Sequence, residues 1–124
     1  MAGSRILIVD DEPYVLHILA FKLRRAGYVA VEAASAEQAR EQLATTPVDC
    51  VVLDVGLETA TTGFDLAQEM REDLRLCRVP IIFLTAHAQP REAHLAEDLG
   101  VVAYITKPFS LQRVLDEIAR VAPA

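Results

Sequence analysis

Five short and largely apolar runs, each of strand length, constrain the fold of this chain more than any other feature. Between them lie segments whose apolar residues recur at helical spacing. The runs are Ile6–Val9, Val29–Ala33, Cys50–Leu53, Ile81–Leu84 and Val101–Ile105. Strands that are apolar at every position are typical of a parallel sheet covered by helices on both faces. The alternation therefore predicts an α/β fold with five strands and five helices around one parallel sheet.

Proline and capping residues mark the starts of several predicted helices. Proline suits the first turn of a helix, and glycine is typical of the position just past its end. Ser35, with Gln38 three residues later, resembles a capping box. Gly27 and Gly100 each end a helix. The helices are predicted over about residues 13–26, 36–43, 64–71, 90–99 and 111–118.

The length of 124 residues fits one domain, residues 1–124, with a core over about residues 5–121. The net charge of −6 disfavours direct binding to nucleic acid or to an anionic membrane. No apolar stretch approaches the length that spans a bilayer, and the N-terminus lacks a signal-peptide pattern. Sparse cysteine, only Cys50 and Cys77, fits a reducing compartment. We therefore expect a cytoplasmic protein.

Polar residues stand at the carboxyl ends of four predicted strands. Asp10 and Asp11 follow the first strand, and Asp54 follows the third. Thr85 follows the fourth, and Lys107 lies just past the fifth. Parallel strands end on the same edge of a sheet, where open α/β folds bind their ligands. We therefore expect these five side chains, which are far apart in sequence, to share one site.

These residue types indicate phosphoryl chemistry at a metal ion. Three clustered carboxylates repel one another unless a cation intervenes. An oxygen-only cluster without His or Cys suits Mg²⁺, which also bridges to phosphate oxygens. An Asp carboxylate can attack a phosphoryl group, and a metal and a lysine can neutralise the charge on the transferring group. Each residue alone has an ordinary reading as a helix cap or loop residue, and their convergence favours the functional one.

Four stretches give the chain a resemblance to the CheY-like receiver domain of two-component response regulators, over essentially its whole length. They are ILIVDDE, CVVLD, PIIFLTA and AYITKPF, in the order and at the spacings typical of that family. The resemblance implies a flavodoxin-like fold with strand order 2-1-3-4-5. It implies that Asp54 accepts phosphate from a histidine kinase or a histidine phosphotransfer protein. Such a domain assists its own phosphotransfer and dephosphorylation and is not a turnover enzyme.

The same resemblance implies a metal site. Asp10 and Asp11 would hold Mg²⁺, with Asp11 and Asp54 as the more direct ligands. The backbone carbonyl of Gly56 would be a further protein ligand.

The resemblance also implies a switch. Thr85 and Lys107 would contact the phosphoryl group, and Tyr104 matches the aromatic residue that changes rotamer on activation. The bond between Lys107 and Pro108 is expected to be cis, which aims the lysine toward the site. The partner-facing surface would be the fourth helix, fifth strand and fifth helix, about residues 91–121, for a homodimer or an output partner.

One loop departs from the family pattern. Glu58 stands where the family has a proline, and Thr59–Thr62 lengthens the loop by one residue before Gly63. This loop supports one alternative, a receiver-like docking module that is not phosphorylated. A phosphatase-type hydrolase is a second alternative, but it would want an acid at Gly56, two residues past the nucleophile. A dinucleotide-binding domain is excluded because no glycine-rich loop follows the first strand.

Overall fold

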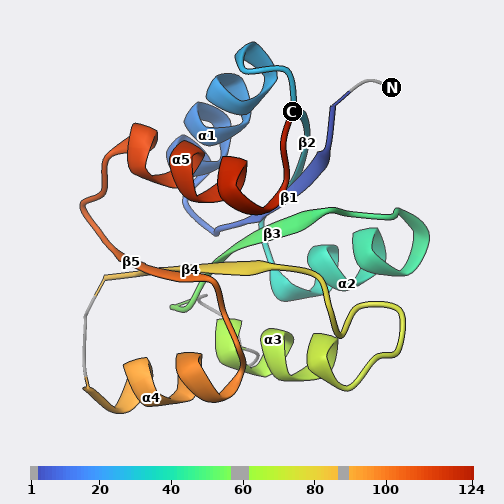
Figure 1. Ribbon diagram of the computed structural model, residues 1–124, viewed down its shortest axis with the longest axis vertical. Coiled ribbons are helices and arrows are strands. Elements are labelled where there is room, and N and C mark those ends of the chain that lie inside the picture. The colour runs from blue at the N-terminus through green and yellow to red at the C-terminus, as the bar shows by residue number, and fades with distance from the viewer. Residues whose placement is uncertain (1–2, 57–61, 87–89) are drawn as a thin grey trace.

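A computed structural model gives the fold over residues 3–56, 62–86 and 90–124 (Figure 1). Its five strands form one parallel sheet in the order β2-β1-β3-β4-β5, which confirms the predicted topology. The strands are β1 (Arg5–Val9), β2 (Val29–Ala33), β3 (Cys50–Asp54), β4 (Ile81–Thr85) and β5 (Ala103–Thr106). The helices are α1 (Pro13–Arg25), α2 (Ala36–Thr45), α3 (Gly63–Arg71), α4 (Pro90–Asp98) and α5 (Leu111–Val121). Within these residues, no helix combines the length and apolarity needed to cross a membrane.

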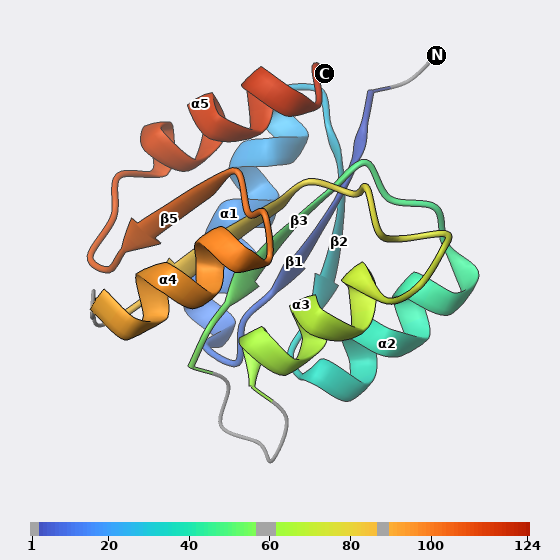
Figure 2. The same ribbon diagram turned by 60° about the horizontal axis from the view of Figure 1, so that its bottom comes forward.

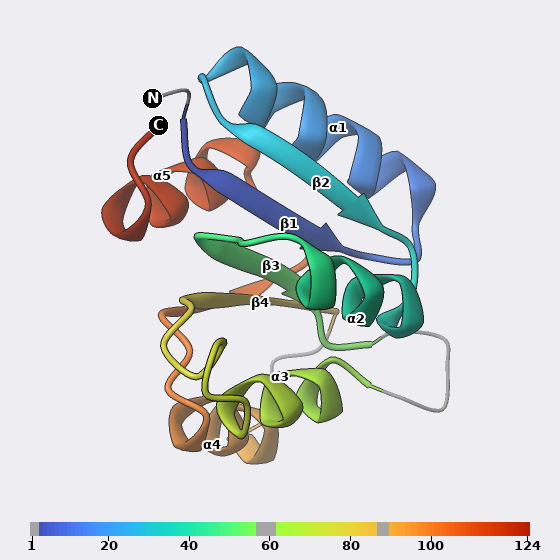
Figure 3. The same cartoon turned by 90° about the vertical axis from the view of Figure 1, so that its right-hand side faces the viewer.

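The helices form two layers, with α1 and α5 on one face of the sheet and α2, α3 and α4 on the other (Figures 2 and 3). Successive strand residues face opposite layers. In β1, Leu7 and Val9 pack in the core under α2, α3 and α4, whereas Ile6 and Ile8 pack under α1 and α5. The inner strands are therefore apolar at every position between their end residues, while the edge strand β2 can carry the half-buried Glu32.

The predicted ends of the third and fourth strands each fall one residue short. Asp54 and Thr85 are the last residues of β3 and β4 instead of following them. Asp54 is paired with Leu84, and the next N–H, that of Val55, donates to the Leu84 carbonyl at 2.9 Å. The acid therefore keeps strand geometry at the very end of the sheet.

The fifth strand begins two residues later than predicted, at Ala103 instead of Val101. Gly100, with a φ of +68°, ends the preceding helix in the left-handed region that favours glycine. The Val101 N–H then donates to the carbonyl of Ala96 at 3.2 Å. Val101 therefore completes the end of α4 and is not part of the sheet.

Side-chain caps open α2 and α3. The Ser35 hydroxyl accepts the N–H of Gln38 at 3.1 Å, as predicted. The Gln38 amide oxygen accepts the N–H of Ala34 at 2.8 Å, one residue before Ser35, so only half of the capping box is confirmed. A complete box opens α3, where Thr62 accepts the Asp65 N–H at 3.2 Å and donates its own N–H to Asp65 at 2.9 Å.

Gly63 starts α3 directly against the end of β3. A Cβ at this position would lie 2.3 Å from the Asp54 carbonyl oxygen and 2.7 Å from the Val55 Cα. The Gly63 N–H also donates to the Val55 carbonyl at 3.1 Å. Only glycine permits this approach.

Glu58 and residues 59–61 lie outside the described part of the chain, so the expected effect of the longer loop stays a prediction.

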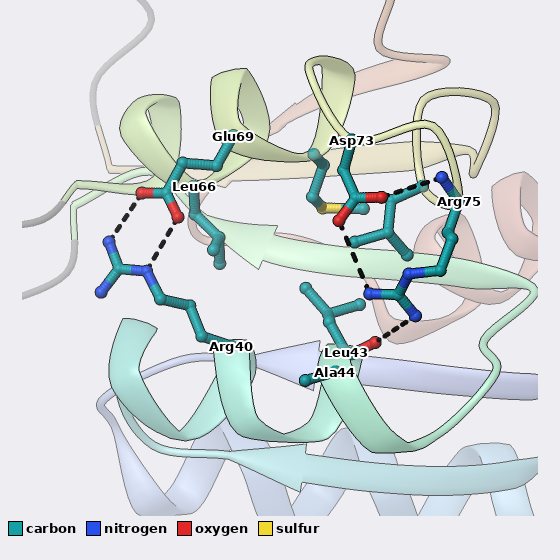
Figure 4. Close-up of a pocket in the computed structure, with 9 residues that line it drawn as sticks. Arg40, Leu43, Ala44, Leu66, Glu69, Asp73 and Arg75 are labelled. Carbon is teal, nitrogen blue, oxygen red and sulfur yellow. Dashed lines mark hydrogen bonds and ion pairs between the residues drawn. The ribbon is translucent and has the colours of Figure 1, made fainter.

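A shallow groove between α2 and α3, about 170 Å³ in volume, has charged groups that pair with each other (Figure 4). Arg40 donates to both carboxylate oxygens of Glu69, at 2.8 and 2.7 Å. Arg75 lies 3.5 Å from the Asp73 carboxylate and also donates to the Leu43 carbonyl. We call these two ion pairs the α2–α3 groove pairs. Their charges cancel, and the contacts of Arg40 with Glu69 and of Arg75 with the Leu43 carbonyl connect α2 to α3 and to the loop that follows it.

Candidate functional site

Three carboxylates meet at the carboxyl edge of the sheet. Asp10 follows β1 and Asp54 ends β3, which is its neighbour in the sheet. Carboxylate oxygens of Asp10, Asp11 and Asp54 all lie within 4.8 Å of one another, which confirms their predicted convergence. Within the described ranges, no other group of His, Cys, Asp and Glu side chains could hold a metal. The oxygen-only donor set fits Mg²⁺. We call this cluster, together with Lys107, the acidic centre.

Asp10 is fully buried, and its surroundings favour the protonated form. One carboxylate oxygen accepts the Glu12 N–H at 2.9 Å, and the other lies 3.1 Å from the Lys107 ammonium. Burial, with the nearby charge of Asp54, raises the pKa of Asp10 to about 6, although the Glu12 N–H and Lys107 act in the opposite direction. A bound cation would favour the ionised form of Asp10 and offset this effect.

Lys107 reaches back from the end of β5 into the acidic centre. Its Nζ lies 3.1 Å from Asp10, 3.2 Å from Asp54 and 3.2 Å from Glu12. Burial would lower the pKa of Lys107, but the charges of Asp54 and Asp10 outweigh it and raise that pKa above its ordinary value. The bond between Lys107 and Pro108 is cis, as predicted. Lys107 is therefore held in its charged form beside Asp54.

Asp54 is buried but lines an open cavity of about 280 Å³. Its Oδ1 accepts the Gly56 N–H at 2.9 Å, and its Oδ2 faces Lys107. Asp11 and Thr85 line the same cavity. Gly56 thus touches the site through its N–H, while the role of its carbonyl as a metal ligand stays a prediction.

Thr85 and Tyr104, the predicted switch residues, share one partner. The Thr85 hydroxyl, buried at the end of β4, donates to Glu92 Oε1 at 3.3 Å. The Tyr104 hydroxyl donates to the same oxygen at 2.9 Å. Burial and this bond to Glu92 raise the pKa of Tyr104. The Tyr104 ring packs edge-on against Phe83, which packs edge-on against Phe64.

Arg71 ties α4 to α3 at the far end of α4 from the acidic centre. Its guanidinium donates to the carbonyls of Leu99 at 2.7 Å, Val79 at 2.9 Å and Cys77 at 3.3 Å. Burial lowers the pKa of Arg71. Its three acceptors come from two different loops, so this side chain holds those loops to the end of α3.

The sequence did not single out Glu12, Glu92 or Arg71 as site or support residues. Glu12 had a signal, since it directly follows Asp10 and Asp11. Glu92 was only one of several charges on a predicted helix, and nothing local indicates that it faces Thr85. Arg71 had no signal, because its partners are backbone carbonyls that carry no residue identity.

Comparisons with known proteins agree with this geometry. The family model of the response regulator receiver domain matches residues 6–119. The phosphate regulon transcriptional regulatory protein PhoB of Pseudomonas aeruginosa is 35% identical over 98% of this chain and 52% of that protein. The chain thus spans about half the length of the curated relatives it matches.

Solved structures show the same likeness. A response regulator receiver protein from Pseudomonas putida aligns with a TM-score of 0.90 and 28% identity, over 97% of this chain and 98% of that one. The receiver domain of a signal transduction histidine kinase from Syntrophus aciditrophicus aligns at 0.86 and 26%, over 96% and 89%. This chain belongs to the response regulator receiver domain family of two-component signalling.

Proposed function

We propose that Asp54 accepts a phosphoryl group from a histidine kinase or a histidine phosphotransfer protein. The observation that carries this proposal is the place of Asp54 between two further carboxylates and Lys107, beside an open cavity. An Asp54 oxygen attacks phosphorus, the phosphorus–nitrogen bond of the phosphohistidine breaks, and the imidazole leaves with the electron pair. The product is an aspartyl phosphate.

Lys107 and Thr85 supply the charge and the hydroxyl that the transferred group needs. The Lys107 ammonium, 3.2 Å from Asp54 Oδ2, is placed to neutralise an oxygen of the new phosphoryl group. Thr85 lines the same cavity and has a hydroxyl proton to donate. The phosphoryl group stays on the protein until water removes it, so the domain acts as a phosphoacceptor and not as a turnover enzyme.

The three carboxylates are suited to hold Mg²⁺, with Asp11 and Asp54 as the more direct ligands, Asp10 behind them and the Gly56 carbonyl as a further ligand. When bound, Mg²⁺ supplies positive charge that the transferring phosphoryl group needs. It also relieves the repulsion among three clustered acids, which one lysine only partly offsets.

The signal leaves through α4, β5 and α5. We propose that Thr85 moves toward the phosphoryl group and that Tyr104 then turns inward beside β4. This changes a surface that can serve a homodimer or an output partner. The relatives do not share one output, because one is a transcriptional regulatory protein and another is part of a histidine kinase.

Intact-mass measurement with acetyl phosphate and Mg²⁺ tests the acceptor. Wild type should gain the mass of one phosphoryl group, and Asp54→Asn should gain none. Asp98→Asn, at the exposed end of α4, is the matched control and should behave as wild type. An adduct on Asp54→Asn would show that the acceptor is another residue, whereas no adduct on wild type would favour the docking module.

NMR tests the switch separately. Beryllofluoride, a phosphoryl mimic, should shift the Tyr104 ring and the amides of residues 101–105 in wild type. Thr85→Ala should still bind the mimic but lose most of these shifts. Equal shifts in both proteins would mean that the signal does not pass through Thr85.

A further inference from the structure

We propose that Glu92 is a positioning residue that holds Thr85 and Tyr104 in the unphosphorylated arrangement and so opposes modification of Asp54. The inference rests on the proposed phosphoacceptor function. Glu92 lies in the first turn of α4, half-buried, and its Oε1 accepts both the Thr85 and the Tyr104 hydroxyl. One oxygen of a helix side chain therefore fixes two side chains on neighbouring strands, β4 and β5.

A phosphoryl group on Asp54 would compete directly with Glu92. Thr85 has a single hydroxyl proton, which can be donated to Glu92 or to a phosphoryl oxygen but not to both at full strength. The phosphoryl group carries a charge of about −1.5 to −2 near neutral pH. Glu92 and Asp54 line the same cavity, so this charge would also repel the Glu92 carboxylate. Both effects favour a state in which Glu92 has left Thr85.

The far end of α4 limits where this release can act. Arg71 donates to the carbonyl of Leu99, just past the last residue of α4, at 2.7 Å. The same guanidinium holds the loop before β4 through Val79. Release of Glu92 therefore removes two hydrogen bonds from the first turn of α4, while the other end of the helix stays attached to α3. The expected motion is a tilt of α4, which changes the surface of α4, β5 and α5.

Reciprocity gives the test. Suppose that the Glu92 contact favours the unphosphorylated state over the phosphorylated one by a certain factor. Removing the contact must then raise the affinity for a phosphoryl mimic by that same factor. With Mg²⁺ present, Glu92→Ala should bind beryllofluoride about 3- to 10-fold more tightly than wild type, the range expected for one net hydrogen bond. Glu92→Gln keeps an acceptor but loses the charge, and should lie in between. Glu97→Gln removes a charge from an exposed position of the same helix and should match wild type.

The Tyr104 ring supplies a readout that a loss of stability would not produce. In Glu92→Ala without beryllofluoride, the ring resonances should move part of the way toward their position in mimic-bound wild type. Wild-type affinity and resonances in both Glu92 variants would overturn the role of Glu92. If Glu92→Ala fails to fold, the comparison of beryllofluoride affinity between Glu92→Gln and Glu97→Gln decides the role of Glu92. Absence of binding in wild type would instead overturn the phosphoacceptor function on which the inference rests.

Discussion

The acidic centre and the α2–α3 groove pairs both gather two or more carboxylates, yet their charges are arranged in opposite ways. In the groove, each carboxylate faces one arginine, and the side chains are between 36% and 61% exposed. In the acidic centre, three carboxylates share one cation, Lys107, which lies beside Asp10 and Asp54, and Asp10 has no exposed surface.

The pKa values separate the two clusters as well. Hydrogen bonds from Arg40 lower the pKa of Glu69, whereas burial raises the pKa of Asp10. Paired and exposed charges contribute little and are typical of a solvated helix surface. Buried and unbalanced charges cost stability, and they are found where a ligand or cation supplies the missing charge. Imbalance and burial, more than the number of charges, distinguish a site from a surface.

The largest expected effect comes from removing the cation of the acidic centre. Lys107→Met should slow phosphorylation of Asp54 by acetyl phosphate about 100-fold, as for loss of one preorganised charge-stabilising group. Arg40→Ala removes a cation from the groove and should leave the rate unchanged. Rates come from intact-mass time courses with Mg²⁺. Equal rates in both variants would erase the functional distinction between the two clusters.

The two clusters should also respond to pH with opposite signs. The pKa of Asp10 is about 6 in the fold against an ordinary 3.8, so the folded protein binds more protons in that window and loses stability as pH rises through it. With a chelator present, Asp10→Asn should therefore raise the free energy of unfolding by on the order of 1–3 kcal/mol above pH 6. The gain should vanish below about pH 4.

Glu69 provides the contrast. The pKa of Glu69 is lowered from its ordinary value of 4.5. Its contribution to stability is therefore fully present at pH values above 4.5 and is lost as the pH falls below that value. Because its side chain is 46% exposed, Glu69→Gln should cost no more than about 0.5 kcal/mol at pH 7. Urea unfolding of both variants from about pH 3 to pH 8 measures the two slopes. Slopes of the same sign would contradict the assignment of burial as the cause at Asp10.

Metal binding should distinguish the clusters next. At Mg²⁺ concentrations tenfold above the dissociation constant, wild type should gain about 1.4 kcal/mol of stability by mass action. Asp11→Ala should lose this response and, through relief of repulsion, be more stable than wild type without metal. Asp73→Asn in the groove should keep the response. Thermal unfolding with and without Mg²⁺ measures all three, and a surviving response in Asp11→Ala would place the metal elsewhere.

The smallest effect belongs to the groove itself. Arg40→Ala removes a bidentate but partly exposed ion pair with Glu69, and should cost less than about 1 kcal/mol. Denaturant unfolding at neutral pH measures the difference. A larger cost would show that the pair stabilises the packing of α2 on α3, and the groove could then not serve as the neutral reference.

Most of the fold and the acidic centre could be predicted from sequence patterns, because the residues involved reflect their local environment. Burial on both faces favours apolar residues through the middle of the inner strands, so an acid at a strand end, such as Asp54, stands out. Parallel topology then brings Asp10, Asp11 and Asp54 together without further information. The start of β5 was harder to predict, because whether Val101 joins a helix or a strand depends on a hydrogen bond to Ala96.

Contacts made across the fold were not readable in the same way. Glu92 stands among other charges of α4, and only the placement of that helix over β4 and β5 brings it to Thr85 and Tyr104. Arg71 binds backbone carbonyls, which leave no trace in the sequence. The capping box of Thr62 and Asp65 was not predicted, although the type and spacing of both residues match such a box.

Gly63 has a consequence for how substitution data on this chain would look. The residue binds no ligand and donates to no catalytic group, yet any side chain there would run into the backbone that carries Asp54. In a library of substitutions at every position, Gly63 would be among the positions least tolerant of substitution and would resemble a catalytic residue. The cause would be steric crowding alone. An activity screen cannot distinguish this effect from the loss of a catalytic acid, whereas a stability screen of the same library can.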